Sequence, residues 1–508
     1  MLPSIDPSNA ALAARYDEIP YAALPHRATH PGMLATVATL AGHPVPAVTR
    51  CSVLEVGCSD GSNLIPMAVS LPAARFVGCD LSSRALDTGR RTSEALGLTN
   101  VTLVEGDLGE LAPANGEFDF IVAHGVYSWV PPDVRDALFA LAAQRLTPNG
   151  ILYVSLNVLP GCRIRQAAWD MLHYHVDRIE NPHARLDAAR QLANLLADGG
   201  ASTHESDQAL RAELRAIAQH SDSELAHDDL AVPNDPVFFH TFVEHAARHG
   251  LRYLAEAEVQ TTGLAGISSA ANAHLSTLDA LGREQYLDFI RLRRFRQSLV
   301  VRADAPADPT EPAHRVRAMH VAANAALASA SAGGSVHKLA RTLDPAAGGG
   351  GAVRKLLETL VAHQPGAFAV ATLADELKLG PFPRPIEAIV GEAYRSGFVD
   401  LHVRAPALTI HPPDRPVASP LARLQALTRT DVTTLLHTQV EIADVNALRL
   451  LPLVDGTRDR AALASAVRQF VVHIDPSRAA DFVKFALEKF ARLGLLMADG
   501  AHVGYAVK

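Results

Sequence analysis

The sequence predicts an α/β fold built on a Rossmann-like parallel sheet. Apolar runs of five or six residues alternate with longer segments of helical spacing, and the first run ends in a glycine turn. Four consecutive runs are followed by a glycine loop or a polar residue. Because open α/β sheets bind ligands beyond the carboxyl ends of their strands, we expect one binding site along that edge.

The first predicted strand, 52–56, leads into a turn between Gly57 and Gly61 and then a helix. Glycines are needed there because the turn requires unrestricted φ and a ligand must approach bare backbone. A dinucleotide site has the spacing G-x-G-x-x-G, whereas this turn has G-x-x-x-G and Glu55 in the preceding strand. A carboxylate in that position suits a cationic ligand better than a phosphate.

Four further strands are predicted over 74–79, 101–105, 118–123 and 151–156. Asp80 follows the first of these, about twenty residues after the glycines, where an acidic side chain can bind a ribose diol. The others are followed by Gly106-Asp107-Leu108, by His124-Gly125 and by Asn157. These residues are therefore expected at the same edge as the glycine turn.

The motifs LEVGCSDGS, FVGCDLS, EGD, FDFIVAHGVYSWV and LTPNGILYVS resemble those of the class I S-adenosylmethionine-dependent methyltransferases. The resemblance covers roughly residues 50–156 and implies a seven-stranded methyltransferase sheet with S-adenosyl-L-methionine as cofactor. It implies that the glycine loop and Glu55 hold the methionine part, Asp80 the ribose hydroxyls, and that Asp107 lies beside the adenine. The expected cofactor-binding residues are Tyr16, Tyr21, Glu55, Gly57, Cys58, Gly61, Asn63, Asp80, Leu81, Gly106, Asp107, Leu108, His124 and Gly125.

Residues 16–34 precede the first strand and begin with Tyr-Asp-Glu-Ile-Pro-Tyr. This start resembles that of one bacterial methyltransferase subgroup, and a segment in this place usually folds over the cofactor. Ala28 departs from the glutamine that the resemblance leads us to expect. Simple packing of Tyr16 and Tyr21 is the alternative to cofactor binding.

Four side chains are candidates for a role near the transferred methyl group: His124, Tyr127, Asn157 and His227. The first three follow the fourth and fifth strands, and His227 precedes a later helix. A lysine acceptor must lose a proton, which requires a base or a low-dielectric channel. His240 and Glu244 share a helix face, but no third ligand has a recognisable spacing, so no metal site is expected.

Six segments are expected along the chain. They are a methyltransferase core with its cofactor-covering segment (1–162), a helical insertion serving as lid, substrate or dimerisation element (163–233), a regulatory-type segment (234–304), a linker region (305–351), a winged-helix-like domain (352–411) and a C-terminal helical or winged-helix-like module (412–508). The segment 234–304 resembles the methyltransferase regulatory domain of the same subgroup. Its order of helix, strand, helix and strand predicts the sixth and seventh strands of the sheet at 253–259 and 297–302.

Net charge, cysteine content and the length of the apolar runs argue against several classes of protein. The formal net charge of -8 argues against a protein that coats nucleic acid, although a local basic face is compatible with it. The four cysteines form no C-x-x-C pair and are expected to be buried and reduced. The sequence shows neither a signal-peptide pattern nor an apolar run of about eighteen residues, so we expect a cytoplasmic protein without a membrane span.

The expected function is methylation of a protein side chain, a lysine amine. Chain length, the N-terminal motif, the regulatory-type segment and the winged-helix-like tail together resemble the bacterial lysine methyltransferases that modify outer-membrane proteins. A small-molecule or peptide O- or N-methyltransferase is the alternative, and a non-catalytic cofactor-binding regulatory protein is the second. The expected partner is a protein substrate, such as an outer-membrane protein, or a small molecule, and a homodimer is a candidate assembly.

Overall fold

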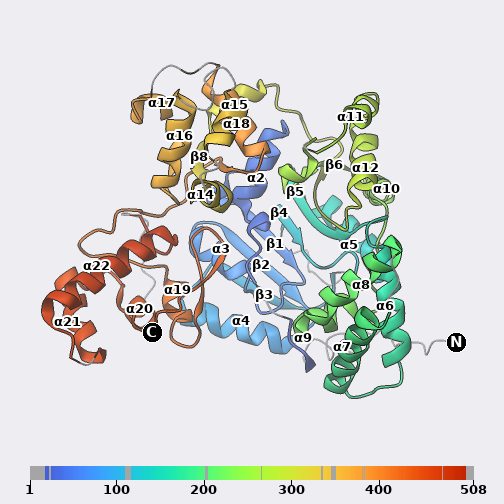
Figure 1. Ribbon diagram of the computed structural model, residues 1–508, viewed down its shortest axis with the longest axis horizontal. Helices are drawn as coiled ribbons and strands as arrows, with labels where there is room; N and C mark the ends of the chain where they lie inside the picture. The colour runs from blue at the N-terminus through green and yellow to red at the C-terminus, as the bar shows by residue number, and fades with distance from the viewer. Residues whose placement is uncertain are drawn as a thin grey trace.

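The computed structural model describes residues 18–21, 24–108, 116–200, 204–264, 266–332, 336–344, 351–379, 382, 384–471 and 473–498. Tyr16, one of the expected cofactor-binding residues, lies outside these ranges. Figure 1 shows a central α/β core, a helical insertion beside it, and two smaller modules formed by the last third of the chain.

A seven-stranded sheet forms the centre of the molecule, as predicted. The strand order is β3-β2-β1-β4-β5-β7-β6. Neighbours among β1 to β5 are parallel, whereas β7 is antiparallel to both β5 and β6. The strands are β1 (Ser52–Val56), β2 (Arg75–Asp80), β3 (Val101–Glu105), β4 (Phe118–Ala123), β5 (Leu146–Asn157), β6 (Leu251–Glu256) and β7 (Phe295–Arg302).

The sixth strand differs from its predicted bounds of 253–259. It begins at Leu251 and ends at Glu256, and a short helix η6 (Val259–Thr262) follows. At the end of the strand, the Glu256 carboxylate binds the buried Arg296 guanidinium at 2.7 Å. This ion pair could not be predicted from the apolar pattern of the segment.

Helices cover both faces of the sheet because neighbouring strand residues point to opposite sides. Val53 packs with Leu34 and Met67 on one face, whereas Leu54 packs with Phe139 and Phe242 on the other. The first face is covered by α2 (Pro31–Leu40), α3 (Leu64–Ser70) and α4 (Ser83–Ala95), and the second by α5 (Pro132–Arg145) and α10 (Phe239–Arg248). Both faces are buried, as the continuous apolar strands predict.

The helical insertion has a core of its own around Trp169, Leu172 and Leu214. It consists of α6 (Arg163–Val176), α7 (Pro182–Asp198), α8 (Glu205–Ala218), α9 (Asp222–Glu224) and the π-helical turn η5 (Leu225–Asp229). Two further helices, α11 (Ser269–Leu275) and α12 (Ala280–Arg291), lie between β6 and β7. The π-helical turn brings residues 227 and 228 back to the edge of the sheet.

The expected linker at 305–351 needs correction, because most of its described residues are folded. The segment supplies α13 (Pro312–Arg317), β8 (His320–Ala323), α14 (Ala325–Ala332) and α15 (Val336–Leu343). These join α16 (Gly351–Ala362), β9 (Ala367–Ala369), α17 (Leu373–Glu376), α18 (Ile386–Arg395) and β10 (Val399–His402) around one apolar core. β8 is the central strand of the sheet β10-β8-β9, so the module predicted over 352–411 is incomplete without it. Glycine and alanine runs around this segment hid the short strand.

The last module packs around Phe490 and Leu487 and contacts α3 through α19. Its elements are α19 (Pro420–Gln425), β11 (Asp431–Thr433), β12 (Gln439–Glu441), α20 (Val445–Leu450), η7 (Leu451–Leu453), α21 (Arg460–Phe470) and α22 (Pro476–Arg492). β11 and β12 form an antiparallel hairpin, and its turn is directed at the catalytic domain.

Across the described parts of the chain, each helix is too short or too polar to traverse a lipid bilayer.

Candidate active site

A cavity of about 1040 Å³ opens at the carboxyl ends of β1, β2, β4 and β5. Twelve of the fourteen expected cofactor-binding residues line it: Tyr21, Glu55, Gly57, Cys58, Asn63, Asp80, Leu81, Gly106, Asp107, Leu108, His124 and Gly125. Gly61 is not among the described lining residues, and its φ of +73° instead turns the backbone into α3. The volume lies at the upper end of the roughly 300–1,000 Å³ usual for ligand sites, which leaves room for two ligands.

The glycine turn and Asp80 are held together by backbone hydrogen bonds. Gly57 has a φ of +69°, a conformation that favours glycine. The Ser59 amide donates to Asp80 Oδ2 at 2.8 Å, and the Ser82 amide donates to Asp80 Oδ1 at 2.9 Å. The carboxylate is thereby fixed at the end of β2, beside the glycine turn.

Glu55 occupies the floor of the cavity beside the glycine turn. Asn63 Nδ2 donates to Glu55 Oε1 at 2.6 Å, while the buried Oε2 accepts no hydrogen bond from the described residues. Burial raises the pKa of Glu55 to about 8, and the nearby Asp80 and Asp60 carboxylates add to this shift although the Asn63 bond opposes it. The site therefore has one buried acceptor that lacks a donor.

The hairpin turn of the last module completes this part of the site. His437 Nε2 lies 2.8 Å from Asn63 Oδ1, and the two residues are 374 positions apart in the chain. The same Asn63 oxygen accepts from the His26 backbone amide at 2.8 Å and from Thr29 Oγ1 at 3.1 Å. Sequence reasoning missed His437, and no local signal could have found it, because only the packing of the last module on the core brings it there.

These residues fit S-adenosylmethionine. The orphaned Glu55 oxygen matches the α-ammonium group of an amino-acid tail, and Asp80 presents two acceptor oxygens to a ribose diol. Asp60, Asp80 and Asp107 make this end of the cavity acidic, which suits a ligand with a positively charged sulfur. A pyrophosphate would meet repulsion from the same carboxylates.

The other end of the cavity combines aromatic and polar side chains. Tyr21, Trp129 and Phe295 line it together with Asn157, His227 and Asp228. The His227 ring meets Tyr21 edge-on at 5.6 Å, and Asn157 Nδ2 donates to Asn234 Oδ1 at 3.0 Å. Burial raises the pKa of Asp228 to about 6, helped by the adjacent Asp229. Trp129, Asp228 and Phe295 were missing from the predicted set of site residues.

Two arginines at this end are neutralised by neighbouring carboxylates. Arg165 binds Asp229 at 2.8 Å, and Arg294 binds Glu213 at 2.5 Å. Glu213 also lies 3.6 Å from Arg165. The pair of Arg294 with Glu213 therefore joins the helical insertion to the start of β7, next to the cavity.

His124 lies between the two ends of the cavity, stacked on the His26 ring at 3.8 Å. Its Nδ1 is 2.9 Å from the Tyr153 hydroxyl, and burial lowers the pKa of His124 to about 3. An imidazole this weakly basic is neutral near pH 7 and does not suit the role of general base. His124 provides a neutral, polar wall.

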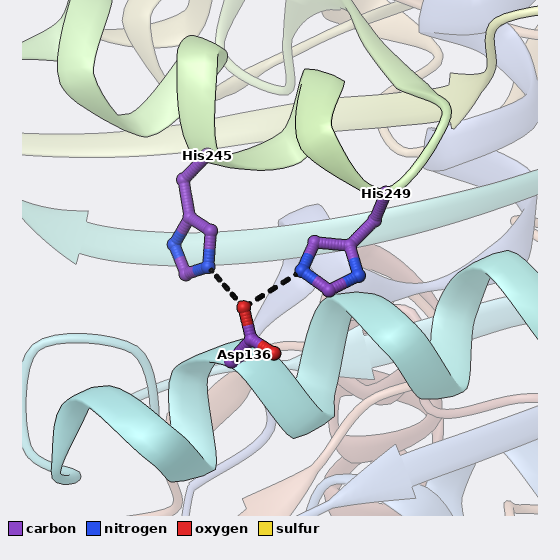
Figure 2. A group of neighbouring side chains, drawn as sticks. All are labelled: Asp136, His245 and His249. Atoms are coloured by element: carbon purple, nitrogen blue, oxygen red, sulfur yellow. Dashed lines mark hydrogen bonds and ion pairs between the residues drawn. The ribbon is translucent and has the colours of Figure 1, made fainter.

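Tyr127, expected near the transferred methyl group, has a different position. It is not among the described lining residues, and its ring packs edge-on against Phe242 at 5.3 Å in the core. Its hydroxyl is 3.0 Å from His245 Nδ1, next to the cluster drawn in Figure 2. β4 ends at Ala123 and the chain turns at Gly125, which has a φ of +67°, so that Val126 lines the cavity while Tyr127 packs in the core.

A seven-stranded sheet with Glu55 next to the glycine turn and Asp80 at the end of β2 is typical of the α/β enzymes that bind S-adenosylmethionine. Comparison with known proteins agrees with this class. Family models match at 53–150 (methyltransferase domain), 221–302 (predicted methyltransferase regulatory domain) and 414–479 (PKMT, C-terminal winged helix domain).

Two uncharacterized proteins of Rickettsia prowazekii are similar in sequence. RP028 is 32% identical over 240 residues, which are 47% of this chain and 96% of RP028. RP789 is 38% identical over 291 residues, which are 57% of this chain and 53% of RP789, so the chain spans about half the length of that relative. The structure of PKMT2 from Rickettsia typhi has a TM-score of 0.80 and 25% identity, and the match covers 94% of this chain and 100% of that one.

The chain belongs to the S-adenosylmethionine-dependent methyltransferases of the bacterial subgroup that carries the methyltransferase regulatory domain. S-adenosyl-L-methionine is the cofactor of this class, and the structure of Rickettsia typhi PKMT2 with AdoHcy has the same fold, with a TM-score of 0.79.

The unusual pKa of Glu55 predicts that cofactor binding depends on pH. Below its pKa of about 8 the carboxyl is largely protonated, so binding an ammonium group must release that proton. We expect the affinity for S-adenosylhomocysteine to fall by up to about tenfold as the pH drops from 8 to 7. Titration calorimetry over this range measures the change. The Glu55→Gln variant has no proton to release and should show a flat profile, whereas an unchanged slope in that variant would contradict the prediction.

The contact of His437 predicts that the last module influences cofactor binding. Replacing His437 with alanine removes one of the donors that hold Asn63, which in turn holds Glu55. We expect S-adenosylhomocysteine to bind a few-fold to about tenfold more weakly, corresponding to about 0.5–1.5 kcal/mol for one hydrogen bond. His473→Ala, at an exposed position in the same module, is the matched control. Equal affinities of the two variants would speak against coupling through Asn63.

Proposed function

We propose that the protein transfers the methyl group of S-adenosylmethionine to lysine side chains of protein substrates. The observation that carries this proposal is the lining of the cavity, which includes three aromatic side chains together with Asp228. Aromatic faces and a carboxylate attract a cationic ammonium group, and neither favours an anionic acceptor. The similarity to Rickettsia typhi PKMT2 over 94% of the chain and the match to a PKMT winged-helix model support the same class of substrate.

The residues of the chain then have three tasks: to hold the cofactor, to orient the acceptor amine, and to receive its proton. Bound S-adenosylmethionine supplies a methyl group on a positively charged sulfur. Glu55, Asn63, Asp80 and the glycine turn hold the cofactor, and Tyr21, Trp129 and Phe295 orient the acceptor amine and exclude water.

A lysine ammonium must also lose its proton before it can attack. Asp228, with a pKa raised to about 6, and His227 beside it are the groups that we propose to receive that proton. Asn157 provides a polar contact at the same end of the cavity.

Transfer of a methyl label tests the substrate class. The purified protein is incubated with methyl-labelled S-adenosylmethionine and lysine-rich proteins, and in parallel with the same proteins after chemical acetylation of their lysines. We expect label only in the unmodified proteins, recovered as methyl-lysine after hydrolysis. Equal labelling of the acetylated proteins would exclude lysine, and label confined to the small-molecule fraction of a lysate would establish the alternative of a small-molecule methyltransferase.

Within the class of protein substrates, we propose an outer-membrane protein, on the basis of the resemblance of the domain order to that bacterial subgroup. The assay above separates this substrate from others when outer-membrane and soluble fractions of a bacterial lysate are offered in turn. Preferential labelling of soluble proteins would contradict the proposal.

We also propose that the protein acts in the cytoplasm as a homodimer. The described cysteines are unpaired and buried, as is typical of a reducing compartment.

The proposed dimer rests on one apolar face of α6, which exposes Ile164, Met171 and Tyr174, and Tyr174 is 90% exposed. Such a face commonly marks an interface between chains. Light scattering with size-exclusion chromatography distinguishes a dimer from a monomer, and a Tyr174→Glu variant tests whether α6 forms the interface.

A further inference from the structure

A group of three ligand-type side chains lies between α5 and α10, separate from the cofactor cavity (Figure 2). Asp136 Oδ1 is 3.3 Å from His245 Nε2 and 2.9 Å from His249 Nε2. The ligand atoms of all three residues lie within 4.8 Å of one another. Both imidazoles thus direct the same nitrogen toward one carboxylate oxygen.

The local structure explains this convergence. His245 and His249 are four residues apart at the end of α10, so their side chains leave the same helix face. Asp136 lies in the first half of α5, opposite that face. Phe139 and Phe242 pack between the two helices with ring centroids 5.6 Å apart, which fixes the distance between them.

Two of the three separations are close to those around a metal ion. Zinc bonds of ~2.0–2.1 Å at tetrahedral angles place neighbouring ligand atoms about 3.3 Å apart, and Asp136 lies 2.9 and 3.3 Å from the two imidazole nitrogens. The two nitrogens lie within 4.8 Å of each other. Two imidazoles and one carboxylate form a common zinc ligand set, with the fourth position left for water.

The surroundings meet two further requirements of such a site. His245 Nδ1 is 3.0 Å from the Tyr127 hydroxyl, an outer contact of the kind that orients metal-binding imidazoles. His245 is buried, with its ring edge-on to that of Phe139 at 4.8 Å. The Asp136 side chain is 60% exposed, which gives an ion access from solvent.

We propose that Asp136, His245 and His249 bind a divalent transition-metal ion, with zinc as the best match to the ligand set. The ion would join α5 of the methyltransferase core to α10 of the regulatory domain. Through Tyr127 it would also support the loop whose neighbouring residues Val126 and Trp129 line the cavity. Its role is structural, since the cluster is separate from the lining of the cavity.

Metal binding by the full chain without a histidine tag tests this proposal. After dialysis against a chelator, calorimetric titration with zinc should show one equivalent bound and a rise in the thermal midpoint, and cobalt should give the absorption bands of a tetrahedral site. We expect His249→Ala to bind zinc roughly 10-fold or more weakly. These measurements need no methyl transfer, so they stand independently of the proposed function.

His240→Ala is the matched control, because His240 lies on the same helix and contacts Gln285 instead of the cluster. It should bind zinc like the unaltered protein. Absence of zinc and cobalt binding in the chelator-treated protein would overturn the proposal. Binding that survives unchanged in both Asp136→Asn and His249→Ala would overturn it as well, because the ion would then be held elsewhere.

Discussion

Replacing Asp80 with alanine is expected to weaken the binding of S-adenosylhomocysteine at least roughly 100-fold. A hydrogen bond to a charged group contributes about 1.5–3 kcal/mol, and a ribose diol offers two donors. Losing both bonds therefore costs about 3–6 kcal/mol of binding free energy. The carboxylate is already oriented by the Ser59 and Ser82 amides, so a ligand has little ordering cost to meet. Titration calorimetry with the purified variant measures the loss.

Two further variants separate ligand contact from damage to the fold. Asp87→Ala on α4 removes an identical side chain that is exposed and pairs with Arg90, and it should leave affinity unchanged. Asp80→Asn keeps one acceptor oxygen for the backbone amides and should lose less affinity than the alanine variant. If Asp80→Ala bound the ligand normally while remaining folded, the assignment of Asp80 to the ribose would be wrong.

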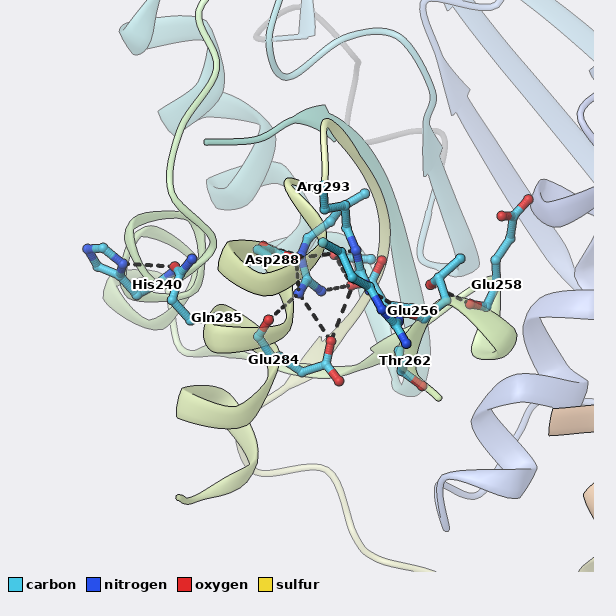
Figure 3. Close-up of polar contacts among 12 residues, drawn as sticks. His240, Glu256, Glu258, Thr262, Glu284, Gln285, Asp288 and Arg293 are labelled. Carbon is cyan, nitrogen blue, oxygen red and sulfur yellow. Dashed lines mark hydrogen bonds and ion pairs between the residues drawn. The ribbon is translucent and has the colours of Figure 1, made fainter. Parts of the chain in front are cut away.

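The second large effect concerns Arg296 on β7, whose side chain is fully buried. Its guanidinium contacts Glu256 at 2.7 Å, Asp288 at 2.8 Å and Glu284 at 3.1 Å. Figure 3 shows these three carboxylates together with Arg293, which binds Asp288 at 3.2 Å. The guanidinium also lies over the Phe239 ring at 3.9 Å, so the network joins strand, helix and apolar core.

Replacing Arg296 with methionine should reduce the free energy of unfolding by about 3–5 kcal/mol, because it removes the cation that Glu256, Asp288 and Glu284 share. Urea denaturation of the full chain, followed through its first unfolding transition, measures the loss. Burial already raises the pKa of Asp288 and of Glu284. Without the guanidinium these pKa values rise further, so the deficit should shrink as the pH falls and the carboxyls become neutral.

Arg354→Met is the control for the loss of an arginine as such. Arg354 and Glu358 form an exposed pair one helical turn apart, which contributes only about 0.3–0.5 kcal/mol. Comparable losses in the two variants, or a deficit at position 296 that does not change with pH, would show that the buried network is not the source of stability.

Much of the catalytic domain could be predicted from local pattern alone. The apolar runs around Val53, Phe76 and Phe120 encode parallel strands buried on both faces. Since the carboxyl ends of such strands meet at one edge, the positions of Glu55, Asp80 and the glycine turn in the sequence imply that they meet in space. Family resemblance then supplied the identity of the ligand.

The pattern of helices and strands after residue 234 also predicted the remaining part of the sheet. It predicted both added strands, and the structure places them side by side at the β5 edge. The pattern did not show where β6 ends. It also did not show that Glu256, the last residue of β6, binds Arg296, which lies 40 residues away.

The short strand β8 was beyond the reach of periodicity. Four residues before an alanine-rich helix give too little alternation to detect, and β8 becomes a strand only because β9 and β10 pair with it on either side. The segment predicted as a linker therefore contains the central strand of the sheet β10-β8-β9.

The sequence by itself determined the class of this protein, since the order of strands, glycines and carboxylates is written in consecutive residues. Tertiary structure alone decided which distant side chains meet: His437 with Asn63, Asp136 with His245 and His249, and Tyr127 with the core instead of the cavity. The physical reason is that hydrophobic periodicity encodes where an element lies and which face it buries. It does not encode which polar groups face each other once separate segments have packed.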